Sequence, residues 1–330
     1  MRTERLPGLV YYPDNAPGIT RRRRGRGFSY IAPDGTSIDN KAERARIAAL
    51  AVPPAYEKVW ISPRPDGHLQ ATGRDARERK QYRYHPHWTE FRSQRKFFQL
   101  PAFGEKLPAI RRAIMRDLQE EAGDRRFAIA AVLALIDRLS LRVGHAAYAK
   151  ENRSYGATTL RTRHVSVKDG EILMNFTAKG GLKVKRRLRD ATLNRTLARL
   201  HDLPGKSLIS WLDDEGVSRD VTSDAVNARL AEITGDDSMT AKTFRTWNGS
   251  VAALERALSS EPVTIKAISE AAADRLHNTP AIARTSYIHP DIIALTEFEP
   301  EARLDAVADA VDRTGLRKTE TRLLALLSRS

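Results

Sequence analysis

The sequence predicts an α+β protein with two domains. A small antiparallel β-sheet domain is expected at residues 1–88, and a larger, mainly α-helical domain with its own small three-stranded sheet at residues 89–330. Three observations predict this arrangement. Proline and glycine separate short apolar and aromatic runs in the first 90 residues or so, helical spacing follows, and residues 164–187 interrupt it with strand-like runs. The length of 330 residues fits two domains of roughly 150 residues each.

The first domain is expected to contain short strands joined by tight turns. Turns such as Pro33-Asp34-Gly35 and Pro65-Asp66-Gly67 separate the runs, which is typical of antiparallel hairpins. The expected strands are residues 28–31, 58–61, 68–72 and 81–85, with one inserted helix at residues 40–50. The basic run Arg21–Arg24 is consistent with either a flexible solvated arm or a phosphate contact.

The second domain is expected to be helical on both sides of its small sheet. The apolar residues that share one helical face are Ile129, Val132, Leu133, Ile136 and Leu139. Gly144 is the expected end of that helix, and Thr279-Pro280 is the expected start of another, with Thr as N-cap and Pro in the first turn. The other expected helices are residues 190–202, 223–234, 240–259 and 263–277, and two more between 300 and 328.

The expected small sheet has three strands. Asp169-Gly170 is a strong hairpin signal between a strand that includes Val165 and Val167 and a return strand at residues 171–176. A second turn, Thr177-Ala178-Lys179-Gly180-Gly181, leads to a third strand at residues 182–188.

Composition narrows the possible functions. Lys and Arg number 56 against 41 Asp and Glu, which gives a formal net charge of +15. Such an excess favours a polyanionic partner, and nucleic acid first. The absence of cysteine excludes disulfides, thiolate metal sites and a cysteine nucleophile. The sequence shows no signal peptide and no apolar run long enough to span a bilayer. We therefore expect a cytoplasmic protein that has no membrane partner.

Common cofactor and hydrolase motifs are missing. Neither G-x-S-x-G nor H-E-x-x-H occurs. His85 and His87 could be two metal ligands, but no third ligand lies nearby in sequence, so we interpret them as surface or structural histidines. We therefore expect no metal and no cofactor.

The stretch from Gly73 to Pro86 combines basic and aromatic residues. Tyr82 and Tyr84 alternate along a strand and therefore share a face. Cations beside aromatic rings suit a duplex backbone and its base edges. A solvated charged loop with a core tyrosine pair would give the same pattern.

Three other segments attract attention only in combination. Taken alone, Arg142 in Leu141-Arg142-Val143-Gly144-His145 would be a snorkelling surface arginine, and Lys179 an ordinary turn lysine. The third segment runs from Lys242-Thr243-Phe244-Arg245-Thr246-Trp247-Asn248 to Leu276-His277-Asn278-Thr279-Pro280 and on to Ser286-Tyr287-Ile288-His289-Pro290.

Taken together, these segments resemble the type IB DNA topoisomerases, most closely the compact poxvirus-like bacterial group. The boxes G-R-D-A-x-x-R-K-Q-Y-x-Y-H-P, R-V-G, A-K-G-G, K-x-F-R-T-W and N-T-P-A-x-A-x-x-S-Y occur in the order of that family, between the Trp60 region and Tyr287.

The resemblance implies a role for each matched residue. Tyr287 matches the nucleophile, Arg142 and Arg245 the two catalytic arginines, and Lys179 the catalytic hairpin lysine. Asn278 falls where many relatives have histidine, and the adjacent His277 lies one residue out of register. The residues expected to contact DNA are Arg74, Lys80, Gln81, Tyr82, Tyr84, Tyr148 and Lys242.

The resemblance also implies an activity. The resemblance predicts a monomer that closes as a C-shaped clamp around duplex DNA in the nucleoid. This enzyme would relax positive and negative supercoils through a 3′-phosphotyrosyl intermediate, without ATP or metal. One alternative is a tyrosine recombinase, which usually has His where Lys242 lies and a helical N-terminal domain. The other is a non-catalytic basic DNA-binding protein.

Overall fold

The computed structural model describes residues 8–201, 203, 207–260 and 262–329, apart from the side chain of Tyr148. The chain divides into two compact units, one up to Lys96 and one from Phe97 onward. The division lies within helix α2 (Pro86–Phe98), slightly beyond the expected boundary after residue 88. The predicted α+β class is confirmed, with a sheet in the first unit and a mostly helical second unit.

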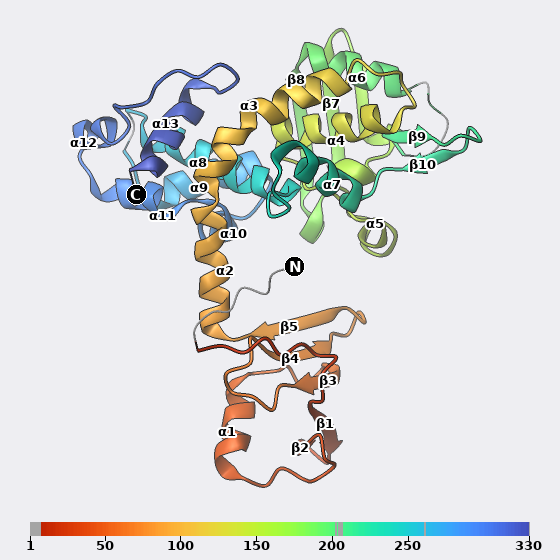
Figure 1. Ribbon diagram of the computed structural model, residues 1–330, viewed down its shortest axis with the longest axis vertical. Helices are drawn as coiled ribbons and strands as arrows, with labels where there is room; N and C mark the ends of the chain where they lie inside the picture. The colour runs from red at the N-terminus through yellow and green to blue at the C-terminus, as the bar shows by residue number, and fades with distance from the viewer. Residues whose placement is uncertain (1–7, 202, 204–206, 261, 330) are drawn as a thin grey trace. The chain divides into compact units, whose positions relative to one another are not determined.

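The first unit is built on a five-stranded antiparallel sheet (Figure 1). Its strands are β1 (Ile19–Arg24), β2 (Gly27–Ile31), β3 (Glu57–Ile61), β4 (Leu69–Arg74) and β5 (Lys80–Tyr84), in the order β2-β1-β3-β4-β5. The predicted helix is α1 (Lys41–Ala49), which begins where the Asn40 side chain accepts a hydrogen bond from the Glu43 amide at 3.0 Å. A small core is formed by Ile19, Ile47, Val59, Ile61 and Ala71.

The run Arg21–Arg24 belongs to strand β1, which contradicts the first of its two alternatives, a flexible arm, and leaves the phosphate contact as a prediction. Its residues pair with β2, for example Arg21 with Tyr30. The Arg21 guanidinium donates to the carbonyl oxygens of Val52, Pro53 and Tyr56, at 3.0, 3.0 and 2.6 Å. Tertiary hydrogen bonds thus stabilise a strand whose sequence lacks apolar alternation.

Helices dominate the second unit. They are α3 (Leu100–Asp117), α4 (Arg125–Leu139), α5 (Ala146–Asn152), α6 (Ala191–His201), α7 (Ser223–Thr234), α8 (Ala241–Ala257), α9 (Ile265–Leu276), α10 (Pro280–Tyr287), α11 (Pro290–Ala294), α12 (Pro300–Asp305) and α13 (Lys318–Ser328). A short hairpin of β9 (Ser210–Leu212) and β10 (Ser218–Asp220) precedes α7. The helices expected from the sequence are therefore present, and none in the described residues is long and apolar enough to cross a membrane.

Helix α4 is the central helix of the second unit. It is buried on nearly every side from Phe127 to Asp137, as expected for a helix surrounded by others. It ends at Leu139, with Ser140 in the left-handed conformation at φ 56°, and not at Gly144 as predicted. The residues after Ser140 therefore lead away from the helix as an extended loop.

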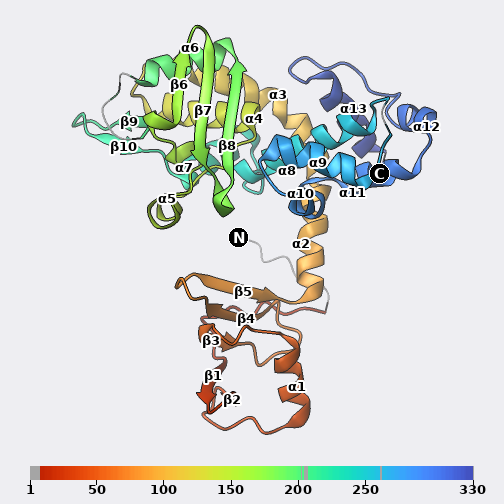
Figure 2. The same cartoon turned by 180° about the vertical axis from the view of Figure 1, so that it is seen from behind.

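The predicted small sheet is also present, as β6 (Val165–Lys168), β7 (Glu171–Thr177) and β8 (Lys183–Arg189). Asp169 and Gly170 both have positive φ, 52° and 76°, as a two-residue hairpin turn requires. Figure 2 shows α4 and α6 on one face of this sheet. The opposite face carries the exposed ends of Lys183, Lys185 and Arg187.

Candidate active site

Arg142 lies in the loop after α4, and close backbone packing fixes that loop. The Arg142 carbonyl accepts the Ala157 amide at 2.8 Å, and the Val143 carbonyl accepts the Thr158 amide at 2.7 Å. A Cβ on Gly156 would lie 2.5 Å from the Arg142 carbonyl oxygen, so only glycine allows this approach. The Arg142 side chain points inward, because its Nη2 donates to Asn278 Oδ1 at 2.6 Å. It is not the snorkelling surface arginine that the sequence also allowed.

Arg245 projects from helix α8 and is 3% exposed. Its Nη1 donates to the Ser140 carbonyl and its Nη2 to the Leu276 carbonyl, so it joins the ends of α4 and α9. No carboxylate in the described residues pairs with it. A buried cation without a counter-charge is costly, and such sites are often functional.

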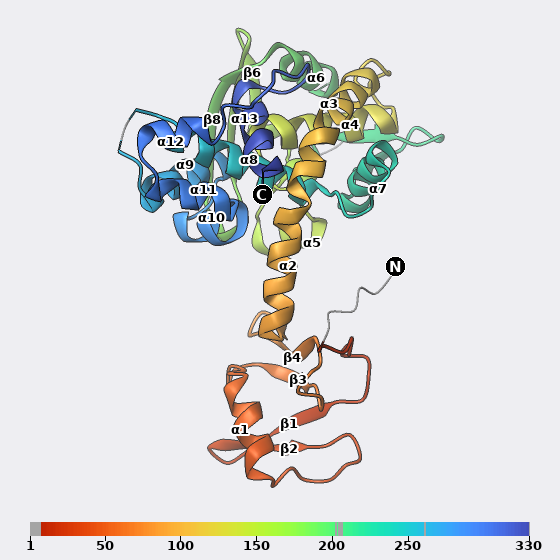
Figure 3. The same cartoon turned by 60° about the vertical axis from the view of Figure 1, so that its left-hand side comes forward.

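Tyr287 is the last residue of α10, and its ring faces Arg245. The Arg245 guanidinium carbon lies 5.1 Å from the ring centroid. Helix α10 packs on α8 and α9 (Figure 3). Gly249 on α8 permits this packing, because a Cβ there would lie 3.0 Å from the Tyr287 carbonyl oxygen. The hydroxyl of Ser250 donates to the same oxygen at 3.1 Å.

The surrounding cations favour the phenolate form of Tyr287. Burial on its own raises the pKa of the phenol, but the positive charges of Arg245, Arg142 and Lys242 outweigh it and hold the pKa below its ordinary value. Burial lowers the pKa of Arg142 to about 10, and repulsion from Arg245 adds to this effect. Arg142 is still protonated at neutral pH, so both arginines present positive charge to the tyrosine.

Asn278, and not His277, places its side chain against Arg142. A guanidinium only donates, so the atom that it contacts must be the amide oxygen of Asn278. His277 ends α9 in the left-handed conformation, and its ring lies toward Arg186 on β8, with Nδ1 and Nη2 3.4 Å apart. Burial, Arg186, Arg245 and Arg142 lower the pKa of His277 to about 4, so its ring is neutral at pH 7.

Two buried donors at this site have no hydrogen-bond partner. They are the Asn278 Nδ2 group and the Arg245 Nε group. An unsatisfied buried donor costs about 1–3 kcal/mol, and native proteins keep few of them. Asn278 contacts Arg142, and Arg245 lies over the Tyr287 ring, so an oxygen-rich anion bound at these two arginines would satisfy both donors.

Lys179 lies on the turn between β7 and β8. The short 3₁₀ turn Lys179–Gly181 has Gly180 and Gly181 at φ 81° and 79°, a conformation that favours glycine. The Lys179 side chain is exposed. This turn and helix α10 lie at the same edge of the second unit (Figures 1 and 2).

Arg186 links that hairpin to the loop of Asn278, although no motif in the sequence singles it out. Its Nη2 donates to the Asp274 carbonyl at 2.6 Å and also approaches the His277 ring. Five of the seven residues of β8 are basic. Nothing in that pattern distinguishes Arg186, because only the tertiary fold brings β8 to the end of α9.

Tyr82 and Tyr84 share a face of the edge strand β5. Their rings are stacked, with centroids 6.0 Å apart and planes inclined by 8°. They are 48% and 38% exposed, which contradicts a core tyrosine pair. The Lys80 ammonium lies 5.5 Å from the Tyr82 ring and also pairs with Asp14.

The other residues expected to contact DNA lie in different settings. Arg74 donates to the Glu78 carbonyl at 2.7 Å and Gln81 to Asp75 at 2.9 Å, so both stabilise the β4–β5 turn. Lys242 is exposed on the first turn of α8. The side chain of Tyr148 lies outside the described residues. All four assignments stay predictions.

Replacing either exposed tyrosine tests this surface. If this surface contacts duplex DNA, as the resemblance implies, Tyr82→Ala or Tyr84→Ala should weaken cleavage about 2- to 10-fold, since one lost hydrogen bond costs about 0.5–1.5 kcal/mol. Cleavage of a labelled duplex measures the effect, and thermal unfolding is the control. A large fall in melting temperature would instead assign the pair a packing role.

Two family models match the chain. Residues 27–75 match the N-terminal domain of bacterial DNA topoisomerase IB, and residues 85–284 match the catalytic core of eukaryotic DNA topoisomerase I. DNA topoisomerase 1B of Acanthamoeba polyphaga mimivirus is 28% identical over 86% of this chain and 89% of its own. DNA topoisomerase I of monkeypox virus and DNA topoisomerase 1B of vaccinia virus (strain Copenhagen) are each 22% identical over 73% of this chain and 76% of theirs. The second match ends shortly before Tyr287.

Proposed function

The chain belongs to the type IB DNA topoisomerase family, and we propose that it relaxes supercoiled duplex DNA by cutting and resealing one strand through Tyr287. The resemblance predicted from the motifs is thereby confirmed, and with it the class of enzyme, a DNA topoisomerase.

The proposed reaction is a reversible transesterification. The Tyr287 hydroxyl gives up its proton to solvent, and its oxygen attacks a backbone phosphorus, forming a 3′-phosphotyrosyl ester. The bond to the 5′-oxygen breaks, and that oxygen leaves as a hydroxyl after it gains a proton. Resealing is the reverse attack by the 5′-hydroxyl. Because the ester conserves the bond energy, the cycle needs no ATP, and supercoils of either sign can relax while the strand is open.

The single observation that carries this proposal is the pair of arginines beside Tyr287, Arg245 and Arg142, whose charges lower the pKa of its phenol. Arg142 contacts Asn278, and Arg245 lies over the Tyr287 ring. The phosphate in the transition state bears extra negative charge on its non-bridging oxygens. Guanidinium groups bind such oxygens in a fork geometry, and the unpaired donors Arg245 Nε and Asn278 Nδ2 would complete the shell.

Lys179 is the proposed acid for the leaving 5′-oxygen. A lysine ammonium can transfer a proton, whereas a guanidinium cannot at physiological pH. The exposed, glycine-flanked turn gives this side chain reach toward a bound duplex. Arg186 would orient the hairpin, because it fixes β8 to the end of α9 next to Asn278.

Duplex DNA is the proposed partner of both units. The exposed tyrosines of β5 and the basic surface of the chain would hold the backbone, with the protein acting as a monomeric clamp around the duplex in the nucleoid. The formal charge of +15 supports this partner. The five-stranded sheet of the first unit is the proposed DNA-clamp domain.

Plasmid relaxation tests the proposed function directly. A supercoiled plasmid of arbitrary sequence should relax in EDTA without ATP, for positive and for negative supercoils. Exchange of strands at one specific sequence would instead indicate a recombinase. A gel shift without any nicking would indicate a non-catalytic DNA-binding protein.

Variants at Asn278 and His277 test the register of the site. Asn278→Ala should slow cleavage on the order of 10²-fold, as for one lost donor to the transition-state oxygens. Asn278→His should keep substantial activity near neutral pH, because imidazole also donates. His277→Ala should lose much less, since its ring lies toward Arg186. Single-turnover cleavage measures all three, and a more damaging His277→Ala would contradict the assignment.

A further inference from the structure

A second group of arginines lies at a pocket formed by α3, the end of α4, the end of α9 and the segment before α13. The pocket has a volume of about 440 Å³. Four arginines line it, Arg111, Arg138, Arg275 and Arg317, with the carboxylates of Asp137 and Asp190. None of these residues has a role in the proposed reaction.

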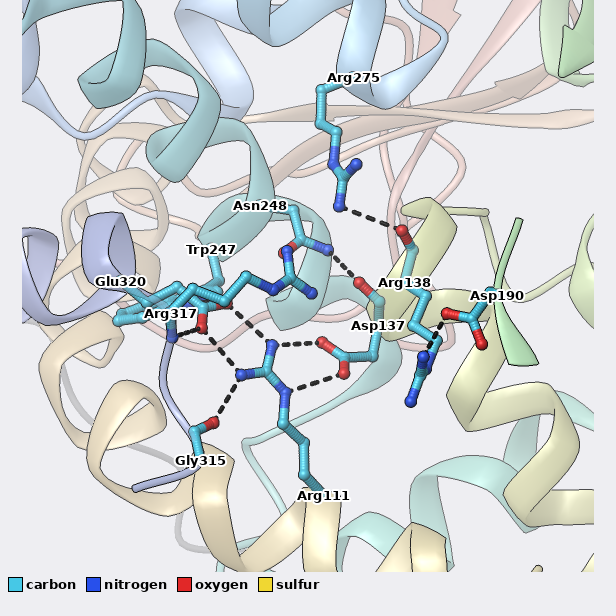
Figure 4. A network of polar contacts seen from close by, with 10 residues as sticks. All are labelled: Arg111, Asp137, Arg138, Asp190, Trp247, Asn248, Arg275, Gly315, Arg317 and Glu320. Carbon is cyan, nitrogen blue, oxygen red and sulfur yellow. Dashed lines mark hydrogen bonds and ion pairs between the residues drawn. The ribbon is translucent and has the colours of Figure 1, made fainter. Parts of the chain in front are cut away.

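The acidic groups at this pocket are already paired (Figure 4). Arg111 bonds both oxygens of Asp137 at 2.9 Å and both oxygens of Glu320 at 2.8 Å. Arg138 forms an ion pair with Asp190. Arg111 and Arg138 thus bind all three carboxylates with two positive charges, and Arg275 and Arg317 bring the whole group to a net charge of +1.

No direct ion pair joins Arg275 or Arg317 to a carboxylate in the part of the chain that the structure describes, although Asp137 attracts Arg275 and Glu320 attracts Arg317 from farther away. Arg275 is half-buried, and its Nη2 donates only to the Arg138 carbonyl, at 3.1 Å. Burial lowers the pKa of Arg275, and repulsion from Arg317 and Arg186 lowers it further, against a smaller attraction from Asp137 and Glu255. Two like charges that repel each other at the wall of a cavity are stabilised when an anion enters between them.

We propose that this pocket binds a phosphate group, through the guanidinium groups of Arg275 and Arg317. Guanidinium forks match the oxygens of a phosphate. The volume exceeds that of one phosphate and leaves room for a diphosphate. The apolar part of the wall, Ile114, Met115 and Ala134, lies on α3 and α4.

The pocket is connected to the active site through the carboxyl end of α4. Three carbonyl oxygens there accept side chains from other helices: Asp137 from Asn248, Arg138 from Arg275, and Ser140 from Arg245. Arg275 also lies three residues before Asn278 on the chain. A phosphate that binds the Arg275 side chain therefore competes with its hydrogen bond to the end of α4. The same end of α4 also holds Arg245 in place.

Calorimetric titration of the whole protein with pyrophosphate, at low salt and without DNA, tests this site. We expect saturable binding that Arg317→Gln weakens about tenfold. Lys318→Gln is the matched control, because it removes the same charge one residue along the chain, and the Lys318 side chain lines a different pocket. The affinity of this variant for pyrophosphate should stay within about twofold of the parent value. Arg275→Gln should also weaken pyrophosphate binding, because it removes the positive charge. Its carboxamide still offers a donor for the Arg138 carbonyl.

A duplex titration identifies the source of the phosphate. If the group is a free anion, Arg317→Gln leaves duplex affinity and its salt dependence unchanged. If the group belongs to a DNA backbone, the same variant weakens duplex binding and reduces the salt slope by about one. Absence of saturable pyrophosphate binding, or equal losses in Arg317→Gln and Lys318→Gln, would overturn the proposal. Neither result depends on cleavage activity.

Discussion

Tyr287→Phe is expected to bind duplex DNA as tightly as the parent enzyme and to form no covalent adduct. The substitution keeps the ring that faces Arg245 and removes only the oxygen. The positive charges that lower the pKa of this phenol would have no nucleophile to activate. Denaturing electrophoresis of a labelled duplex measures the adduct, and a gel shift measures binding.

Tyr155→Phe is a suitable control for this experiment. Tyr155 is another tyrosine of the second unit, but it is buried, its ring packs against His164, and Arg161 lies near it. Adduct formation should stay near the parent level in this variant. An adduct in Tyr287→Phe that maps to another tyrosine would show that the nucleophile has been misassigned.

Local signals in the sequence were sufficient for much of the fold. The Asp169-Gly170 turn determines its hairpin through its own positive φ angles. Thr279 caps α10 and Gly235 ends α7, as their residue types predict. These features depend on neighbours in the chain, so they can be recognised without tertiary information.

Features that depend on tertiary contacts were missed or misplaced. Strand β1 has an arginine run whose pairing depends on β2 and β3. Helix α4 ends at Leu139 because Ser140 takes a left-handed conformation while Arg245 caps its carbonyl, and no local signal predicts that. The same limit applies to the site. Motif order named Arg142, Arg245, Asn278 and Tyr287, but only the structure shows the unpaired donors and the contact from Arg186.

Lys179→Ala should slow cleavage of an ordinary phosphodiester by about 10²–10⁴-fold, the range of general acid catalysis. Without the acid, the 5′-oxygen must leave as an alkoxide, which is a poor leaving group. A substrate with sulfur in place of the bridging 5′-oxygen avoids this cost, because a thiolate leaves without a proton. Lys179→Ala should therefore cleave the sulfur substrate nearly as fast as the parent, as single-turnover assays can measure.

The comparison with other cations makes this prediction specific to proton transfer. Lys179→Arg should stay slow on the natural substrate, since it restores the charge without a transferable proton. Arg245→Ala should be slow on both substrates if its guanidinium acts on the non-bridging oxygens, and Arg142→Ala should show at most partial rescue. Lys185→Ala, on the exposed face of β8, removes an equal charge from the same hairpin and should cleave both substrates at close to the parent rate. Equal impairment of Lys179→Ala on oxygen and sulfur would make Lys179 a phosphate contact, and another group would have to protonate the leaving oxygen.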